Sequence, residues 1–114
     1  MSSEHYPDGT VRSVTTGYRT TVTLHGEFDI AVTPVLTAHL DDATAGPRPE
    51  VVVDLRTVTF IDCSTLGLLC RAGRRCRERD GTLTLICTDP RTLHLLGIAG
   101  LPQAVPLADL RSRP

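Results

Sequence analysis

The stretch Val51–Leu69 constrains the fold more than any other part of the chain. It opens with three consecutive valines, which are typical of a buried strand, and after a polar break it continues in a helical pattern. Asp62 directly precedes this pattern, where a carboxylate can cap the first free amides of a helix. The stretch therefore predicts a strand, a loop and a helix, with Cys63, Ser64 and Thr65 gathered at the helix start.

Two β-rich segments, 11–16 and 18–25, come before this stretch and are divided by Gly17. We expect Gly26–Asp29 to close the second strand. Asp29 then stands where it can cap a helix that reaches about Ala45. The apolar stripe predicted for this helix comprises Ile30, Val35, Leu36 and Leu40.

The part of the chain after Asp62 predicts a helix from about Cys63 to Arg79, ended by the turn residues Asp80 and Gly81. A strand over 82–87 follows, and Asp89 begins a shorter helix. On that helix we expect three apolar residues to face inward and one histidine to be a partly buried packing residue. They are Leu93, Leu96 and Ile98, with His94.

Strands that alternate with helices of these lengths predict an α/β domain, in which helices pack on a mixed sheet of four to five strands. The three valines imply cover on both sheet faces. Residues 11–106 are expected to form the single domain, between a flexible tail at 1–10 and a turn or tail at 107–114. Within the domain, 101–105 is a candidate edge strand. Right-handed crossovers would place Glu27–Asp29 beside Asp62–Ser64.

Charge and composition argue against several classes of protein. Twelve basic and thirteen acidic residues give a net charge of -1, and with two Phe, two Tyr and no Trp a direct nucleic-acid partner is not expected. We interpret the arginines between Arg71 and Arg79 as a solvated helix face. The chain has no window apolar enough to span a membrane, which predicts a soluble cytosolic protein.

The four cysteines show neither a CxxC pair nor a metal-ligand spacing, so we expect free, mostly buried thiols and no metal. The start of a helix can lower the pKa of a thiol, but Asp62 opposes this effect and no histidine lies in the motif to act as a base. A buried or half-buried structural thiol is therefore expected at Cys63. Phosphate-binding, metalloprotease and serine-hydrolase motifs are absent, so neither an enzyme nor a cofactor is predicted.

Several segments together carry a family resemblance. Gly26–Asp29, the strand Val51–Leu55, the run Phe60–Gly67 and the later segment from Asp89 resemble the STAS domains of bacterial anti-sigma factor antagonists, over about 22–101. The resemblance implies a single STAS-type domain. It further implies a non-catalytic protein that binds an anti-sigma factor with serine kinase activity, with a phosphatase that reverses the phosphorylation. The partner-binding residues that it implies are Asp29, Asp62, Cys63, Ser64, Thr65, Leu66 and Gly67.

One substitution changes what the resemblance implies for regulation. In the family the serine that accepts phosphate directly follows the aspartate, and in this chain that position is Cys63. A serine kinase cannot use the thiol in its place, so Ser64 becomes the phosphoacceptor candidate, with Thr65 as a second choice. Two alternatives stay open: a partner-binding protein that has lost the switch, and a STAS scaffold or ligand-sensing module that works without phosphorylation.

Overall fold

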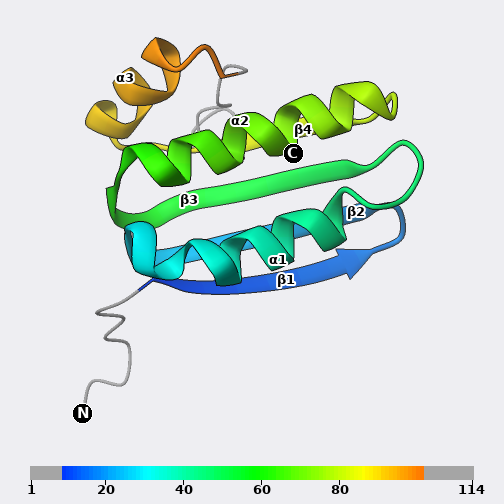
Figure 1. Cartoon of the computed structure of the whole chain (residues 1–114), viewed down its shortest axis with the longest axis horizontal. Coiled ribbons are helices and arrows are strands. Elements are labelled where there is room, and N and C mark those ends of the chain that lie inside the picture. The colour runs from blue at the N-terminus through cyan, green and yellow to red at the C-terminus, as the bar shows by residue number, and fades with distance from the viewer. Residues whose placement is uncertain (1–8, 102–114) are drawn as a thin grey trace, which may run out of the picture.

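The computed structural model describes residues 9–101 as one layer of strands with helices packed against it (Figure 1). The strands are β1 (Thr10–Thr16), β2 (Arg19–Phe28), β3 (Glu50–Ile61) and β4 (Thr82–Ile86). The helices are the 3-10 turn η1 (Ile30–Val32), α1 (Thr33–Ala43), α2 (Cys63–Glu78) and α3 (Pro90–Ile98). The predicted edge strand at 101–105 and the tails at 1–10 and 107–114 lie mostly or wholly outside the described residues.

The sheet has the order β1-β2-β3-β4 and is mixed, as predicted. β1 and β2 form an antiparallel hairpin, whereas β2, β3 and β4 run parallel. Because the two parallel connections step across the sheet in the same direction with the same hand, α1 and α2 lie on the same face. The expectation of cover on both faces is therefore not met by these helices: Val51 and Val53 are buried beneath them, while Val52 lies on the other face and is only partly buried.

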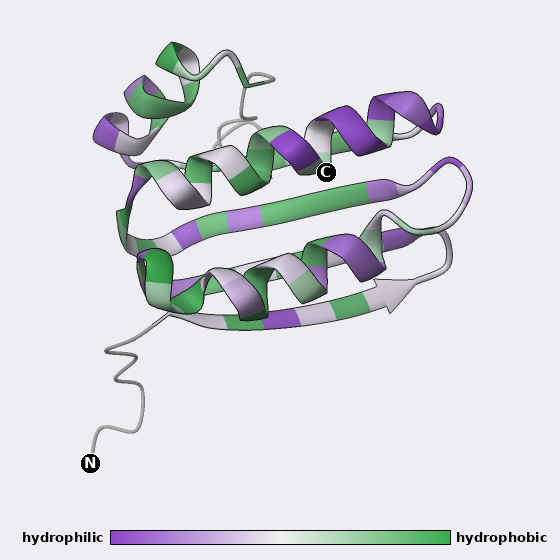
Figure 2. Ribbon diagram, in the orientation of Figure 1, coloured by the Kyte–Doolittle hydropathy of each residue, from purple (hydrophilic) through white to green (hydrophobic). Residues whose placement is uncertain are grey.

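The core lies between this sheet face and the two helices. Its largest fully buried side chain is Phe28, and most of the others are leucines and valines. Figure 2 shows the apolar run along β3 beside the mixed surfaces of α1 and α2. Asp41 of α1 pairs with Arg71 of α2 at 2.7 Å, and Arg75 donates to the Thr44 hydroxyl at 2.8 Å. The predicted solvated arginine face is thus only part of the run, because two of its members hold α1.

β3 is longer than predicted, because the expected polar break is a bulged strand. Between the pairs Thr23–Asp54 and His25–Thr57, β3 has one residue more than β2, and a second extra residue precedes Phe60. Each extra residue shifts the side-chain alternation by one position. The residues that face the helices are therefore Val53, Leu55, Val58 and Ile61.

Side chains satisfy the backbone groups that the first bulge leaves unpaired. The Arg56 N–H donates to Asp54 Oδ1 at 3.0 Å, and the Thr57 hydroxyl donates to the Leu24 carbonyl at 3.0 Å. Asp54 also binds the Arg56 guanidinium, with Oδ2 to Nη2 at 2.5 Å. An unpaired backbone group would be costly here, so these contacts fix the bulge.

Three residues that we expected to face inward, and one that we expected to be partly buried, are exposed. The buried stripe of the first helical segment is Val32, Leu36, Leu40 and Thr44, because the tighter turn of η1 sets its phase. Ile30 and Val35 fall off that stripe, at 73% and 50% exposed. On α3, Ile98 and His94 each follow a buried residue by two positions, which is more than half a helical turn, and both are exposed.

Two of the three predicted helix caps are confirmed, whereas Asp29 caps only the 3-10 turn η1 and α1 begins after Val32 without a side-chain cap. Asp62 and Asp89 accept backbone N–H bonds at the starts of α2 and α3. At the end of α2, Asp80 adopts a left-handed φ of 59° and Gly81 donates to the Cys76 carbonyl at 2.7 Å. None of the helices within residues 9–101 has the length and apolar character needed to cross a bilayer.

Candidate functional site

The candidate site lies where β2 and β3 end and α2 begins. Phe28 pairs with Ile61 as the last residues of two parallel strands, and the Asp62 N–H donates to the Phe28 carbonyl at 3.1 Å. The predicted closeness of Glu27–Asp29 and Asp62–Ser64 is thereby confirmed. The parallel pairing is the reason, since it brings the ends of both strands to one edge of the sheet.

Asp62 is the centre of this site. Its Oδ1 accepts a hydrogen bond from the Thr65 N–H at 3.1 Å and one from the Ser64 hydroxyl at 2.7 Å. The Ser64 hydroxyl is the main cause that lowers the pKa of the Asp62 carboxyl, and the Thr65 N–H lowers it further. Asp62 is therefore a carboxylate at neutral pH, held against the positive end of the helix dipole.

The three side chains after Asp62 differ in exposure. Cys63 is exposed, Ser64 is half-buried, and Thr65 is buried with its hydroxyl donating to the Phe28 carbonyl at 3.4 Å. The buried stripe of α2 begins at Thr65 and continues through Leu69, so Cys63 points away from it. The expectation of a buried or half-buried thiol at Cys63 is wrong.

The remaining predicted residues surround this start of α2. Asp29 is exposed and caps η1 by accepting from the Ala31 N–H at 3.0 Å. Leu66 is partly buried against the core. Gly67 is exposed, and a Cβ built on it would meet nothing within 4 Å. It therefore leaves this part of the α2 surface without a side chain. The fold thus brings the whole predicted set to one end of the molecule.

Sequence reasoning missed the apolar side chains around this set. Ile30 is 73% exposed, Phe60 is 52% exposed, and Leu95 and Ile98 of α3 are 36% and 71% exposed. Figure 1 shows that η1, the end of β3, the start of α2 and α3 lie at the same end of the molecule. The sequence carries no signal for this surface, because Ile30 and Ile98 resembled core positions and Phe60 fell in an expected loop.

The other cysteines fit the expected free thiols. Cys76 and Cys87 are buried, and burial raises the pKa of each thiol. Cys70 is half-buried and donates weakly to the Ala99 carbonyl at 3.8 Å. Within residues 9–101, no three His, Cys, Asp or Glu side chains are grouped so that they could hold a metal ion.

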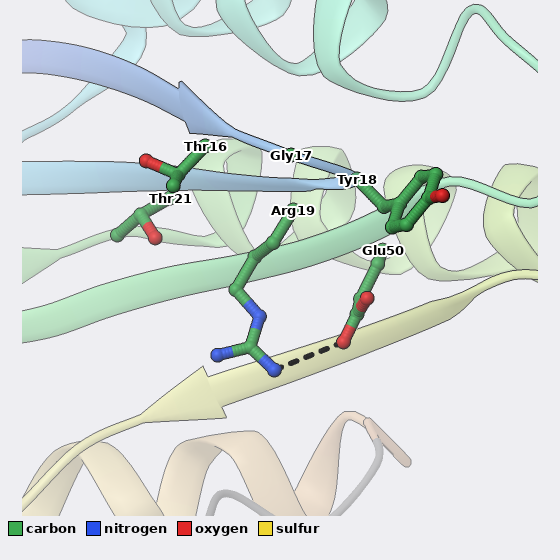
Figure 3. A pocket seen from close by; sticks show the side chains of 6 residues that line it. All are labelled: Thr16, Gly17, Tyr18, Arg19, Thr21 and Glu50. Carbon is green, nitrogen blue, oxygen red and sulfur yellow. Dashed lines mark hydrogen bonds and ion pairs between the residues drawn. The ribbon is translucent and has the colours of Figure 1, made fainter.

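A hollow at the opposite end of the sheet offers a contrast. It measures about 360 Å³ and lies around the β1–β2 turn, on the face that α1 and α2 leave uncovered (Figure 3). Arg19 and Glu50 pair across it at 3.0 Å, and Tyr18 at its edge is 92% exposed. Its two charged residues satisfy one another, so this hollow presents no unpaired charge to a ligand.

Comparison with known proteins shows which family the sequence matches. The family model described as "Mlab, STAS domain" matches residues 11–109. An anti-sigma F factor antagonist of Paenibacillus polymyxa is 26% identical over 89 residues, which cover 77% of this chain and 76% of that protein.

Solved structures agree with the fold. The crystal structure of an anti-sigma factor antagonist from Mycobacterium paratuberculosis has a TM-score of 0.73 at 24% identity, over 89% of both chains. The unphosphorylated form of the anti-sigma factor antagonist SpoIIAA has a TM-score of 0.76 at 20% identity, over 91% of this chain and 96% of that one. The phosphorylated form of the Bacillus protein SpoIIAA has a TM-score of 0.72 at 20% identity, over 91% and 100%. The fold and the match along nearly the whole domain show that this chain belongs to the STAS domain family.

Proposed function

We propose that the chain is a non-catalytic anti-sigma factor antagonist, which binds a kinase-type anti-sigma factor through the surface around the start of α2. The observation that supports this most is the combination of a capped helix start with exposed apolar neighbours. Cys63 and Gly67 are exposed on α2, Ile30 is exposed on η1 and Phe60 is exposed near the end of β3, and the start of α2, η1 and the end of β3 lie at the same end of the sheet. Exposed apolar groups around a small polar centre are typical of a protein-binding surface.

Within this surface the predicted residues take different parts. Asp29, Cys63 and Gly67 are exposed and are available for direct contact with a partner. Asp62 and Thr65 contribute through position, because they join the helix start to the end of β2. Ser64 and Leu66 lie between these two groups as half-buried side chains. Binding therefore depends on a rigid helix start as well as on the exposed side chains.

Phosphorylation of Ser64 is the regulation that this geometry supports. The Ser64 hydroxyl is half-buried and donates to Asp62, and a phosphorylated oxygen has no hydrogen to donate. The phosphate would add roughly -1.5 to -2 charges beside a carboxylate. It would break the bond to Asp62 and place a second anion at the partner surface. Thr65 is a poor acceptor by comparison, because it is 1% exposed.

The alternative is a STAS scaffold or ligand-sensing module that works without phosphorylation. Two observations favour it: a thiol occupies the position of the usual phosphoacceptor, and the hydroxyl of Ser64 is engaged in the helix cap. In this alternative the chain binds a ligand or another protein through contacts that do not depend on Ser64. A phosphatase then has no role, and the fraction of partner bound depends on the concentrations of the two proteins at a fixed affinity.

A pair of Ser64 variants separates the two proposals. The purified chain is used to capture proteins from the cytosol of its source organism, and a captured kinase-type anti-sigma factor is then purified for affinity measurements. Under the switch, Ser64→Asp weakens binding by about 30-fold, since a like or unpaired charge at an interface costs about 2 kcal/mol. Ser64→Ala keeps the wild-type affinity. Equal affinities for both variants would leave the scaffold alternative, and failure of the wild-type chain to bind any such factor would reject the proposed function.

A further inference from the structure

A groove between the end of β3 and α3 lies next to the candidate site. It measures about 200 Å³. Its apolar lining comes from Phe60, Ile61 and Leu95, and its charges come from Asp89 and Arg91. Phe60 is 52% exposed and Leu95 is 36% exposed, so this is apolar surface that the described part of the fold leaves in contact with water.

The two charged residues of the groove are in different states. The Asp89 carboxylate accepts from the N–H and the hydroxyl of Thr92, both at 3.0 Å, and these bonds lower the pKa of Asp89. Arg91 is exposed, and within residues 9–101 its guanidinium makes no hydrogen bond or ion pair. The carboxylate of Asp89 is therefore occupied by the helix cap, and the nearby charge of Arg91 lowers its pKa further. Because no hydrogen bond joins the two side chains, the donors of the Arg91 guanidinium remain available to an outside group.

We propose that this groove binds one apolar side chain of the anti-sigma factor, flanked by a carboxylate that pairs with Arg91. The proposal rests on the proposed function for the identity of the partner. The chemistry of the occupant follows from the groove: its apolar lining matches an aliphatic or aromatic side chain, and a guanidinium is the preferred partner of a carboxylate in proteins.

Size and position favour a protein segment over a small molecule. Sites for small ligands usually enclose about 300–1,000 Å³, and this groove is smaller than that range. It also adjoins the candidate site along the chain, because Phe60 and Ile61 directly precede the capping Asp62. Exposed aromatic and arginine side chains next to one another are typical of the few residues that supply most of an interface's binding energy.

The test measures the affinity of the full chain for the purified kinase-type anti-sigma factors of its source organism. Phe60→Ala removes the aromatic side chain, and Tyr18→Ala is its matched control, because Tyr18 is an exposed aromatic residue at the opposite end of the sheet. Arg91 is changed to Glu, Gln and Lys, and Arg77→Glu is the control for charge reversal at another exposed arginine. Urea unfolding of every variant checks that the fold is retained.

We expect Phe60→Ala to weaken binding by about tenfold or more, as for a residue at the centre of an interface. At position 91 the affinity should fall in the order Arg, Lys, Gln, Glu, and both controls should bind like the wild-type chain. Wild-type affinity in the Phe60→Ala and Arg91→Glu variants, with loss of binding in Ser64→Asp, would overturn the groove and leave the proposed function standing. Tighter binding by Arg91→Glu would also overturn it, since the partner group would then be a cation. If the wild-type chain binds no such factor, the groove loses its occupant together with the proposed function.

Discussion

Asp54 and Asp62 are two aspartates of one segment of the chain, and they differ in what surrounds them. Asp54 lies inside β3, is 6% exposed and is bound by the guanidinium and the N–H of Arg56. Asp62 lies just beyond β3 and is bound by a hydroxyl and an amide at a surface. Both carboxyls have a lowered pKa. The difference teaches that the same ionised group fixes a strand bulge where its partners are the N–H and guanidinium of a neighbouring arginine, and caps a helix where its partners are a hydroxyl and an amide.

The largest effect on stability is expected from Asp54→Ala. The substitution removes the acceptor of the Arg56 N–H in the bulge and the partner of its guanidinium. Because the Arg56 side chain is 42% exposed, water can replace part of what is lost, and we expect the free energy of unfolding to fall by about 2 kcal/mol. Urea unfolding measures this value. A loss as small as that of a surface substitution would show that Asp54 does not fix the bulge.

Asp62→Ala should reduce affinity for the partner more than it reduces stability. Its loss of stability is expected to be smaller than that of Asp54→Ala, because Asp62 is half-buried whereas Asp54 is buried, and because the helix retains its packing against the sheet. Its effect on affinity for the anti-sigma factor should be larger, since the start of α2 carries the proposed surface. Unfolding curves and binding isotherms of the two variants, recorded side by side, show whether one mainly loses stability and the other mainly loses affinity. Losses of stability and affinity in the same proportion in both variants would contradict the difference that we assign to the two aspartates.

Acid should reveal the structural aspartate. Burial raises the pKa of Asp54, but the hydrogen bonds from the side chain and backbone of Arg56 lower it by more, so the net pKa is below the ordinary value. A group with a lowered folded pKa contributes stability that is complete above its unfolded pKa of about 4 and is lost as pH falls through the folded pKa. Urea midpoints of the wild-type chain should therefore fall below about pH 4. Asp54→Ala should lose less over the same interval, and an equal loss in both would assign the acid sensitivity to other groups.

The smallest effect is expected from Ser64→Ala. The variant removes the hydroxyl that contributes most to the lowered pKa of Asp62, while the Thr65 N–H remains. Carbon-detected NMR titration should show the pKa of Asp62 moving upward toward its ordinary value, with a stability close to that of the wild-type chain. The pKa of Asp54 in the same spectra is the internal control. An unchanged pKa of Asp62 would mean that Ser64 does not donate to it in solution.

Local signals allowed the starts of α2 and α3 and the order of the elements to be predicted. Asp62, Asp89 and the turn at Asp80 act on neighbours within a few residues, so their roles can be read from the sequence. The bulges of β3 could not be predicted in this way, because an extra strand residue resembles a break unless the partner strand is known. The exposure of Phe60 could not be predicted either, because it depends on the second bulge. The exposure of Ile30 depends on the phase of the 3-10 turn η1, which the sequence pattern did not reveal.

The meeting of the two loops at the candidate site was predicted from the sequence, and the exposure of the side chains there was predicted only in part. Parallel pairing made the closeness of Phe28 and Asp62 foreseeable from the order of strands and helices. The difference in exposure between Cys63 and Thr65 depends on which face of α2 meets the sheet. That face is set by packing, and the first turn of a helix contains too few apolar residues to define it.

The most direct test of the central claim is a map of the partner surface by NMR. Backbone amide signals of the full chain are followed during titration with the purified anti-sigma factor. We predict the largest changes at Phe28–Ile30, Phe60–Gly67 and Arg91–Leu95, with little change around the β1–β2 turn. Changes centred on Thr16–Thr21 and Glu50, with the start of α2 unaffected, would contradict the assignment of the binding surface to this end of the sheet.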